Sequence, residues 1–166
     1  MRISQEDQKS YSKFTQYISK ALPGVLNVPV IVANMKRFGG FSYDKLASTL
    51  AWGHGPNIKI LNLRESTQPA FNICVAGVAA AYGCTRGGET KEIEVDSFTV
   101  AEFEKDPYGT GMGQNSRHQN LFIVGVTVLH ELCHLGCNIH GISEATFAGG
   151  EAGNAYEKAT YGKMVP

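Results

Sequence analysis

The chain has 166 residues, of which 43% are apolar and 10% aromatic, which is enough for a buried core and excludes an intrinsically disordered chain. Fifteen Lys and Arg residues balance fifteen Asp and Glu residues, so the formal net charge is zero. This balance argues against nucleic acid or an anionic membrane as the main partner, since either needs a basic excess or a basic stripe.

The length fits one domain, and no internal repeat or linker divides the sequence, so we expect a single domain over residues 1–166. We expect no transmembrane segment, because the longest apolar run, Leu121 to Leu129, is far shorter than the roughly 20 residues that span a bilayer. Residues 1–7 are polar and lack the apolar stretch of a signal peptide. If the protein leaves its cell, another export route is expected to carry it.

The first half of the chain predicts two helices and two strands. Residues 4–22 have helical spacing of apolar side chains after a capping Ser4, and residues 43–50 repeat that pattern after Ser42. The β-branched residues 28–33 predict a strand, and the alternation over residues 58–63 predicts a second one.

The middle of the chain is less regular. Residues 70–84 are apolar but rich in small side chains, and we interpret them as a strand or a buried loop. Residues 91–98 alternate between charged and apolar side chains, which is typical of an exposed edge strand. Residues 100–105 indicate a helical turn, and residues 106–116 indicate a loop.

The C-terminal part predicts a long buried helix over residues 120–137, and a last helix over residues 151–161 that ends at Gly162. Together these elements predict an α+β fold with a central helix beside a small mixed sheet and flanking helices. The four cysteines are too few for a disulfide scaffold. Buried thiols are the favoured interpretation, although a short bridge in an oxidising compartment stays open for the first pair. The cysteines are Cys74, Cys84, Cys133 and Cys137.

The long helix contains the motif His130-Glu131-Leu132-Cys133-His134. Residues four apart lie on the same face of a helix, about 6 Å apart, so two imidazoles can converge on one Zn²⁺. Glu131 is turned away from the metal but lies near enough to accept a proton from an attacking water. Random placement produces this motif in about one in a hundred such chains, and an apolar lead-in followed by ionisable residues favours a metal that offsets the burial cost.

Two interpretations without catalysis compete with this one. Histidines near the C-terminal end of a helix are favoured by the helix dipole alone. A structural zinc site using Cys133, His134, Cys137 and His140 is the other, but these residues lie on or just after one helix, and closed sites normally draw on two segments.

A catalytic zinc site needs a third protein ligand, and two residues are candidates. Glu151 opens the next helix, and a carboxylate from a second helix completes a His₂Glu set. His140 follows His134 by the spacing of the metzincin pattern, but that pattern needs glycine at position 137, where Cys137 stands, and the glycine comes one place early at Gly136. We favour Glu151 and keep His140 as the alternative.

From residue 128 onward the chain resembles small zincin-type metallopeptidase toxins. These are effector domains that bacteria attach to, or load onto, type VI secretion spikes of the VgrG kind. The resemblance rests on the blocks Val128–Gly136 and Gly150–Glu157, which follow the patterns L-H-E-L-x-H-x-G and E-x-G-x-x-(F/Y)-E. It implies a zincin-like α+β fold in which the central helix carries the active site, and it implies that Glu151 is the third zinc ligand. Cys133 within the motif and His140 after it depart from the pattern.

The expected function is therefore zinc-dependent hydrolysis of peptide bonds in a peptide, a protein or a cell-wall peptide. Glu131 is the expected catalytic base, Tyr161 is a candidate for oxyanion stabilisation, and Glu157 is a candidate to orient a ligand histidine. The resemblance further implies an antibacterial effector that acts in the periplasm of a rival cell, with an immunity protein and a secretion spike as partners. A non-catalytic, zinc-stabilised protein-binding module is the alternative.

Overall fold

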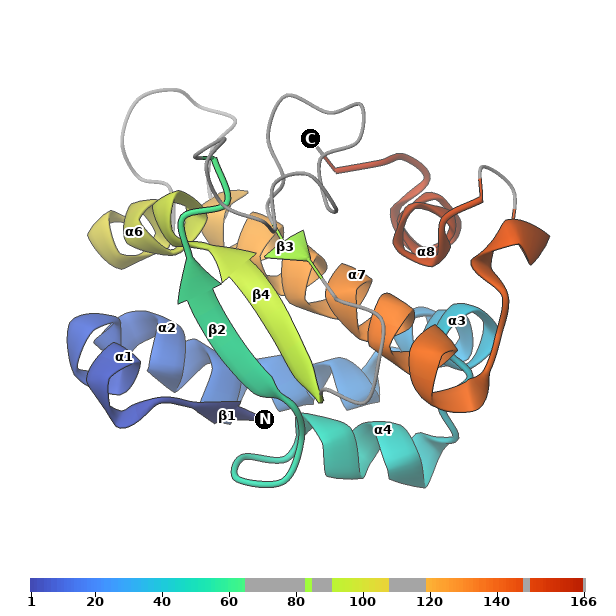
Figure 1. Cartoon of the computed structure of the whole chain (residues 1–166), viewed down its shortest axis with the longest axis horizontal. Coiled ribbons are helices and arrows are strands. Elements are labelled where there is room, and N and C mark those ends of the chain that lie inside the picture. Colours follow the sequence, from blue (N-terminus) through green and yellow to red (C-terminus); the bar gives the residue numbers. More distant parts are fainter. Residues whose placement is uncertain (65–82, 85–90, 108–118, 148–149, 166) are drawn as a thin grey trace.

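The computed structural model describes residues 1–64, 83–84, 91–107, 119–147 and 150–165 (Figure 1). In these residues, short helices pack around one long helix, and a small sheet lies beside them. In chain order the elements are β1 (Arg2–Ile3), α1 (Gln5–Ser10), α2 (Ser12–Gln16), the π-helical turn η1 (Tyr17–Ala21), the 3₁₀ helix η2 (Leu22–Asn27), α3 (Pro29–Gly39), α4 (Tyr43–Leu50), β2 (Asn57–Leu61), β3 (Gly83–Cys84), β4 (Glu92–Asp96), α6 (Ser97–Lys105), α7 (Gln119–His140), the 3₁₀ turn η3 (Glu144–Thr146) and α8 (Ala152–Tyr161).

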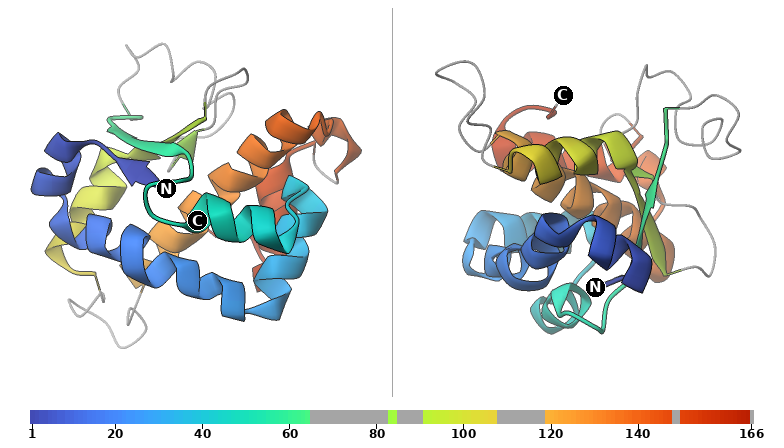
Figure 2. Two further views of the ribbon diagram at one scale, coloured as in Figure 1. Left: turned by 90° about the horizontal axis from the view of Figure 1, so that it is seen from below. Right: turned by 90° about the vertical axis from the view of Figure 1, so that its left-hand side faces the viewer.

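The sheet has the order β1-β2-β4-β3. The first three strands are parallel, with Ile58 of β2 beside Ile93 of β4, and β3 runs antiparallel to β4. The helices lie on one side of this sheet, as the two further views show (Figure 2). The expected α+β class with a small mixed sheet is confirmed.

The prediction that residues 91–98 form an exposed edge strand is wrong. Strand β4 pairs on both sides, and most of its residues are buried. The charged side chains of β4 suggested an exposed strand, but some of them are paired with residues elsewhere in the fold. Asp96 is fully buried, bonds the Arg64 guanidinium at 2.8 Å and caps α6 through Thr99, while Lys59 meets Glu92 across the strands at 2.7 Å. Within the described residues the sheet edge beside β4 is β3.

The prediction of a strand over residues 28–33 is also wrong, since these residues open helix α3. Pro29 stands at the first turn, where its missing N–H costs nothing, and a left-handed Gly40 ends the helix. Of the β-branched side chains, Ile31 faces the core, one turn before the buried Met35. Tertiary packing overrides β propensity here.

The two helices predicted in the first half are present, and the one over residues 43–50 has the expected limits as α4. Ser4 and Ser42 both cap helices, as expected. The single helix expected over residues 4–22 is instead broken at Tyr11 and continues through α2, η1 and η2. The predicted strand over residues 58–63 is confirmed as β2, and the helical turn over residues 100–105 is the second half of α6.

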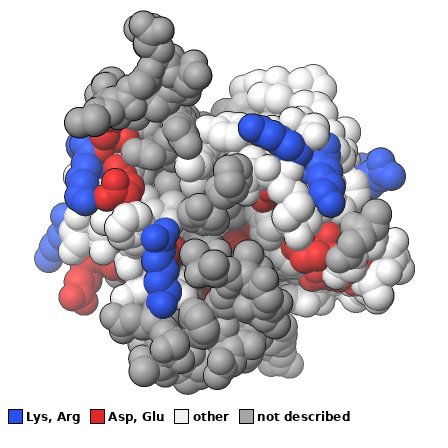
Figure 3. Space-filling view, turned by 90° about the horizontal axis from the view of Figure 1, so that it is seen from above, with Lys and Arg blue, Asp and Glu red and all other residues white. Residues whose placement is uncertain are grey.

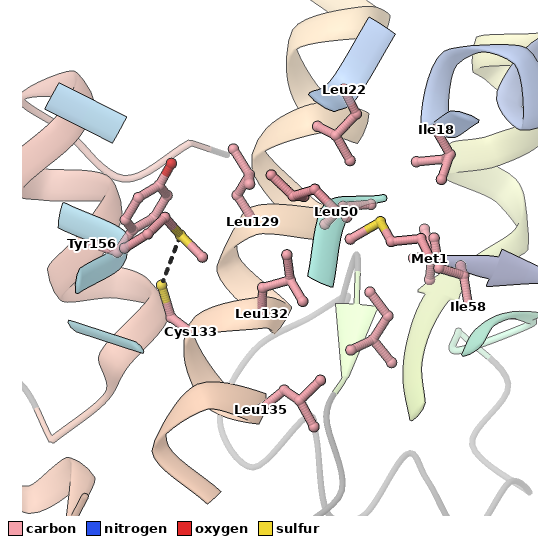
Figure 4. Packing of buried hydrophobic residues seen from close by; sticks show 14 of the residues in the cluster. Met1, Ile18, Leu22, Leu50, Ile58, Leu129, Leu132, Cys133, Leu135 and Tyr156 are labelled. Atoms are coloured by element: carbon pink, nitrogen blue, oxygen red, sulfur yellow. Dashed lines mark hydrogen bonds between the residues drawn. The ribbon is translucent and has the colours of Figure 1, made fainter. Parts of the chain in front are cut away.

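Helix α7 is the centre of the packing (Figure 4). Leu132 and Leu135 point from it toward the sheet, whereas Cys133 points toward Tyr156 of α8. The Cys133 thiol lies 3.6 Å from the Met35 sulfur, and all these side chains are buried. Two sides of α7 are therefore covered by apolar contacts, as the long apolar run predicted.

By length and composition alone, residues Phe122–His140 of α7 pass as a membrane span, with a mean hydropathy of 1.4. However, 67% of this stretch is buried inside the fold. The core helix of a folded domain has the same properties, so this stretch is weak evidence for a span.

On the face seen in Figure 3, the Lys and Arg side chains of the described residues do not form a continuous basic stripe. Lys and Arg lie there in separate groups, among acidic and uncharged side chains of the described residues. This distribution on one face agrees with the zero net charge of the sequence. Most of the predicted strand or loop over residues 70–84, most of the predicted loop over residues 106–116, and Cys74 lie outside the described residues.

Candidate metal centre

Three side chains from two helices meet at one point. His130 and His134 lie one turn apart on α7, and their ring centroids are 5.0 Å apart. Glu151 is the N-cap residue of α8, the helix that packs beside α7. One potential ligand atom from each of the three lies within 4.8 Å of the others. Such a group can hold a metal ion.

The two imidazoles direct the same nitrogen at the same oxygen. His130 Nε2 lies 3.2 Å from Glu151 Oε1, and His134 Nε2 contacts that oxygen as well. The three side chains are between 17% and 25% exposed, so they are neither sealed in the core nor fully solvated. A cation and a small part of a substrate can therefore reach them from solvent.

The opposite nitrogen of each imidazole is held by a second carboxylate. His130 Nδ1 donates to Glu157 Oε1 at 2.7 Å, and His134 Nδ1 donates to Glu144 Oε1 at 2.8 Å. Each Nδ1 is thus used as a donor to a carboxylate, and both Nε2 atoms face the shared point, where they donate to Glu151 while protonated and can bind a cation once deprotonated. Metal-ligating histidines typically have such carboxylate partners.

The acidic surroundings shift the pKa values of the histidines. Burial alone would lower the pKa of His130, but hydrogen bonds to Glu151 and Glu157 outweigh burial and raise the pKa to about 10. Burial likewise opposes the hydrogen bonds of His134 to Glu144 and Glu151, which raise its pKa to about 9. Burial would raise the pKa of Glu151, yet the two imidazoles hold it well below its usual range. A cation that binds the two imidazoles must therefore displace their protons.

The first residues of α8 lie very close to the imidazole ring of His130. The Glu151 carboxylate accepts from the backbone N–H of Gly153 at 2.9 Å and from that of Asn154, so it caps the helix. A Cβ at Gly153 would lie 2.3 Å from Cδ2 and 2.4 Å from Nε2 of the His130 ring. Only glycine leaves room for the imidazole at this point. This requirement explains the glycine two residues after Glu151.

Glu131, the expected catalytic base, is buried on α7 next to His130. Its negative charge contributes to the raised pKa values of both His130 and His134, so its carboxylate lies close to the metal-ligating group. This position is compatible with the predicted role.

His140 is not a member of the group formed by the described residues. Helix α7 continues through Gly136 and Cys137 to His140, whereas the metzincin pattern requires the chain to leave the helix there. Six residues correspond to 600° of rotation at about 100° per residue, so His140 emerges on a different side of the helix from His134. Its ring instead packs edge-on against Phe41, with the centroids 5.9 Å apart.

The cysteines of α7 also lie away from the histidine nitrogens. Cys133 and Cys137 are free, buried thiols. Cys133 contacts the sulfur of Met35, and Cys137 donates to the Phe38 carbonyl at 3.1 Å. Both thiols therefore serve the packing of α7 against α3, and the structure does not assemble the four-ligand Cys and His site.

Tyr161, the candidate for oxyanion stabilisation, lies at the last residue of α8. Its hydroxyl is 3.1 Å from that of Tyr156, and its ring packs edge-on against Phe122. Burial raises its pKa. The structure thus places Tyr161 in an aromatic cluster and shows no direct contact with the three ligand candidates.

Glu144 is the residue of the site that the sequence interpretation missed. It lies in the turn η3 between the two ligand helices, in a segment with no apolar periodicity. Glu157, by contrast, lies on the helix that begins after Glu151 and was expected to orient a ligand histidine. Because the contact of Glu144 depends on the path of the connection, the sequence carries no local signal for it.

The donor set fits the metal that the sequence predicted. Two imidazole nitrogens and one carboxylate oxygen are the protein ligands of one common class of catalytic zinc site, which leaves a position for water or substrate. The two carboxylates behind the imidazoles supply the outer contacts that such ligands typically have. The structure therefore contains a His-His-Glu site suited to a divalent cation.

Comparisons with known proteins agree with this chemistry. No curated protein and no solved structure matches the chain. The family model described as metallopeptidase toxin 3 matches residues 7–162, which include every residue of the candidate centre. This match covers nearly the whole chain and shows that the protein belongs to the metallopeptidase toxin 3 family.

Proposed function

We propose that this protein is a zinc-dependent metallopeptidase that hydrolyses peptide bonds and acts as a secreted antibacterial effector. The observation that carries the proposal is the convergence of His130 Nε2, His134 Nε2 and Glu151 Oε1 beside the buried Glu131. Membership of a metallopeptidase toxin family supports both the hydrolytic and the toxic part.

The protein's own residues have separate roles in this proposal. His130, His134 and Glu151 hold the cation, and Glu157 and Glu144 keep the two imidazoles oriented. When bound, zinc supplies Lewis-acid polarisation of the scissile carbonyl and lowers the pKa of water. The Glu131 carboxylate accepts a proton from the attacking water and passes it to the leaving amine.

The substitution Glu131→Gln tests the catalytic role. It removes the proton acceptor but none of the three ligand atoms, so we expect unchanged zinc content and a loss of hydrolysis of about 10²- to 10⁴-fold. Zinc is measured by elemental analysis. Hydrolysis is measured by mass spectrometry on unfolded proteins and, separately, on purified cell-wall peptides, which also identifies the substrate class.

Glu102→Gln is the matched control, because Glu102 lies on α6 and pairs with Lys105 at the surface. It should retain both zinc and activity. Full hydrolysis by the Glu131→Gln variant would exclude Glu131 as the base. Toxicity that survives this substitution in a protein that hydrolyses neither substrate would instead support a zinc-stabilised binding module.

The biological setting is part of the same proposal. A toxin of this class is expected to travel on a type VI secretion spike, to act in the periplasm of the target cell, and to be neutralised by an immunity protein. The neighbouring genes test this setting. A gene for a small immunity protein or a VgrG-type spike beside this one supports it, and a neighbourhood of unrelated metabolic genes argues against it.

A further inference from the structure

The connection between α7 and α8 carries a carboxylate that touches both ligand helices. Glu144 Oε1 accepts from Nδ1 of His134 at 2.8 Å, and Glu144 Oε2 accepts from the backbone N–H of Ala152 at 3.0 Å. Ala152 is the residue directly after Glu151. One side chain therefore contacts a histidine ligand on one helix and the backbone beside the carboxylate ligand on the other.

The connection that presents Glu144 is anchored in the core. Phe147, three residues later, packs edge-on against Phe38 of α3 with the ring centroids 5.5 Å apart. Its backbone N–H donates to the Glu144 carbonyl at 3.0 Å, and its carbonyl accepts from Gly150 at 2.9 Å. On the other side of Glu144, the backbone N–H of Ile142 donates to the Cys137 carbonyl at 2.9 Å, so the backbone is held on both sides of Glu144.

Glu144 differs from Glu157, the other carboxylate behind an imidazole. Glu157 Oε1 accepts from His130, but its Oε2 accepts from the backbone N–H of Val165 at 2.6 Å, beyond the end of α8. Glu157 therefore fixes one ligand against the following segment. Glu157 lies on α8 itself, so its bond to His130 also joins the two ligand helices. Glu144 differs because it lies outside both helices and accepts from the backbone N–H directly after Glu151.

An exposed ion pair with His134 would be the simpler explanation, and it would contribute little to stability, since water and salt screen such pairs. The second bond to Ala152 distinguishes Glu144 from such a pair, because both carboxylate oxygens are used and both partners adjoin ligand atoms. The bond from Nδ1 to Glu144 fixes the orientation of the His134 ring, so its Nε2 stays at the point it shares with Glu151.

We propose that Glu144 is a positioning residue of the metal centre, which fixes the ring of His134 and sets the distance between α7 and the start of α8. This inference rests on the cation site of the proposed function but not on its peptidase chemistry. Glu144 acts through His134 and Glu151 and need not touch the substrate.

The experiment compares zinc affinities of the full chain by competition with a chromophoric chelator. We expect Glu144→Ala to weaken zinc binding about 10- to 100-fold, the usual effect of removing a partner that orients a metal ligand. Glu144→Gln should lose less, because its carbonyl oxygen can still accept from His134. Glu102→Gln is the surface control and should bind zinc as the wild type does.

A second readout separates positioning from general stabilisation. In the zinc-loaded protein, NMR detects the Nδ1–H protons of the two ligand histidines. Glu144→Ala should shift the His134 proton and speed its exchange with water, while the His130 proton, held by Glu157, stays in place as an internal control. A merely structural role would lower the unfolding midpoint without this selective change.

The outcomes distinguish the inference from the proposed function. If the wild type binds zinc and both Glu144 variants bind it equally tightly, with an unchanged His134 proton, the positioning role is overturned and the peptidase proposal stands. If the wild type binds no zinc, both fail. Should Glu144→Ala not fold by circular dichroism, the isosteric Glu144→Gln decides, because a wild-type affinity and His134 proton in that folded variant would overturn the role.

Discussion

At the scale of single residues, the absence of a side chain at Gly153 is as important as the ligands. The imidazole of His130 occupies the space that a Cβ at this position would take. We expect Gly153→Ala to displace the ring from Glu151 and to weaken zinc binding by about tenfold or more, the scale of losing a ligand-orienting contact. Chelator competition measures the change in affinity.

Gly24→Ala is a suitable control for this substitution, because no atom lies within 4 Å of the added Cβ and the residue also lies in a helical turn. It should leave zinc affinity unchanged. An unaltered affinity in the Gly153→Ala protein would mean that α8 can move aside without loss, and the close approach would then have no role in metal binding.

Whether a site residue can be predicted from the sequence depends on whether residues close to it in the sequence determine its position. His130 and His134 could be assigned because one helical turn fixes their relation, and Glu151 because it starts the next helix after a glycine-rich reversal. Glu144 could not be assigned, because its contact with His134 arises only when η3 folds back over the end of α7.

At the scale of elements, the crossing of α3 and α7 determines where the motif lies. A Cβ at Gly136 would stand 2.1 Å from the Gly39 carbonyl oxygen and 2.6 Å from the ring of Phe41. The two backbones therefore approach more closely than any other residue would allow. We expect Gly136→Ala to lower the free energy of unfolding by about 1–3 kcal/mol, the typical cost of overpacking.

Urea denaturation of the metal-free proteins measures this loss, with Gly24→Ala as the open-space control that should stay close to the wild type. Because Gly136 faces α3 and not the imidazoles, zinc affinity of the folded variant should remain within about twofold. A Gly136→Ala protein as stable as the wild type would show that α3 and α7 separate freely at this crossing.

Packing between elements also explains the two wrong strand predictions. Residues 28–33 are β-branched, but the burial of Ile31 and Met35 on one face decides in favour of helix α3. The alternating charges of β4 suggest an exposed strand, but Asp96 is paired with Arg64 and serves as a helix cap. In both cases contacts distant in sequence outweigh a local pattern.

At the scale of the whole molecule, stability, pH and metal are linked through the centre. In the metal-free protein the pKa values of His130 and His134 are raised to about 10 and about 9, above an unfolded value near 6.5. Their contribution to stability is therefore present below pH 6.5 and is lost as the pH rises through 9 and 10. Glu151, with its lowered pKa, contributes above an unfolded value near 4.5 and loses this contribution at lower pH.

Zinc has the opposite pH dependence: it should stabilise the protein more as the pH rises, because it binds the deprotonated imidazoles and must displace their protons. Between pH 6.5 and 8.5 we expect the unfolding midpoint of the chelator-treated protein to fall and the additional stability from zinc to grow. At a free zinc concentration of 100 Kd, this additional stability is about 2.7 kcal/mol. Thermal unfolding at several pH values, with zinc or with chelator, measures both trends.

The variant His134→Ala isolates the cause of this linkage. It removes one of the two proton-binding imidazoles and one ligand, so its metal-free stability should depend less on pH in this range and zinc should add little. If instead the metal-free wild type became more stable between pH 6.5 and 8.5, the carboxylates could not be holding protons on these imidazoles. The electrostatic description of the centre would then be wrong, even if zinc still bound.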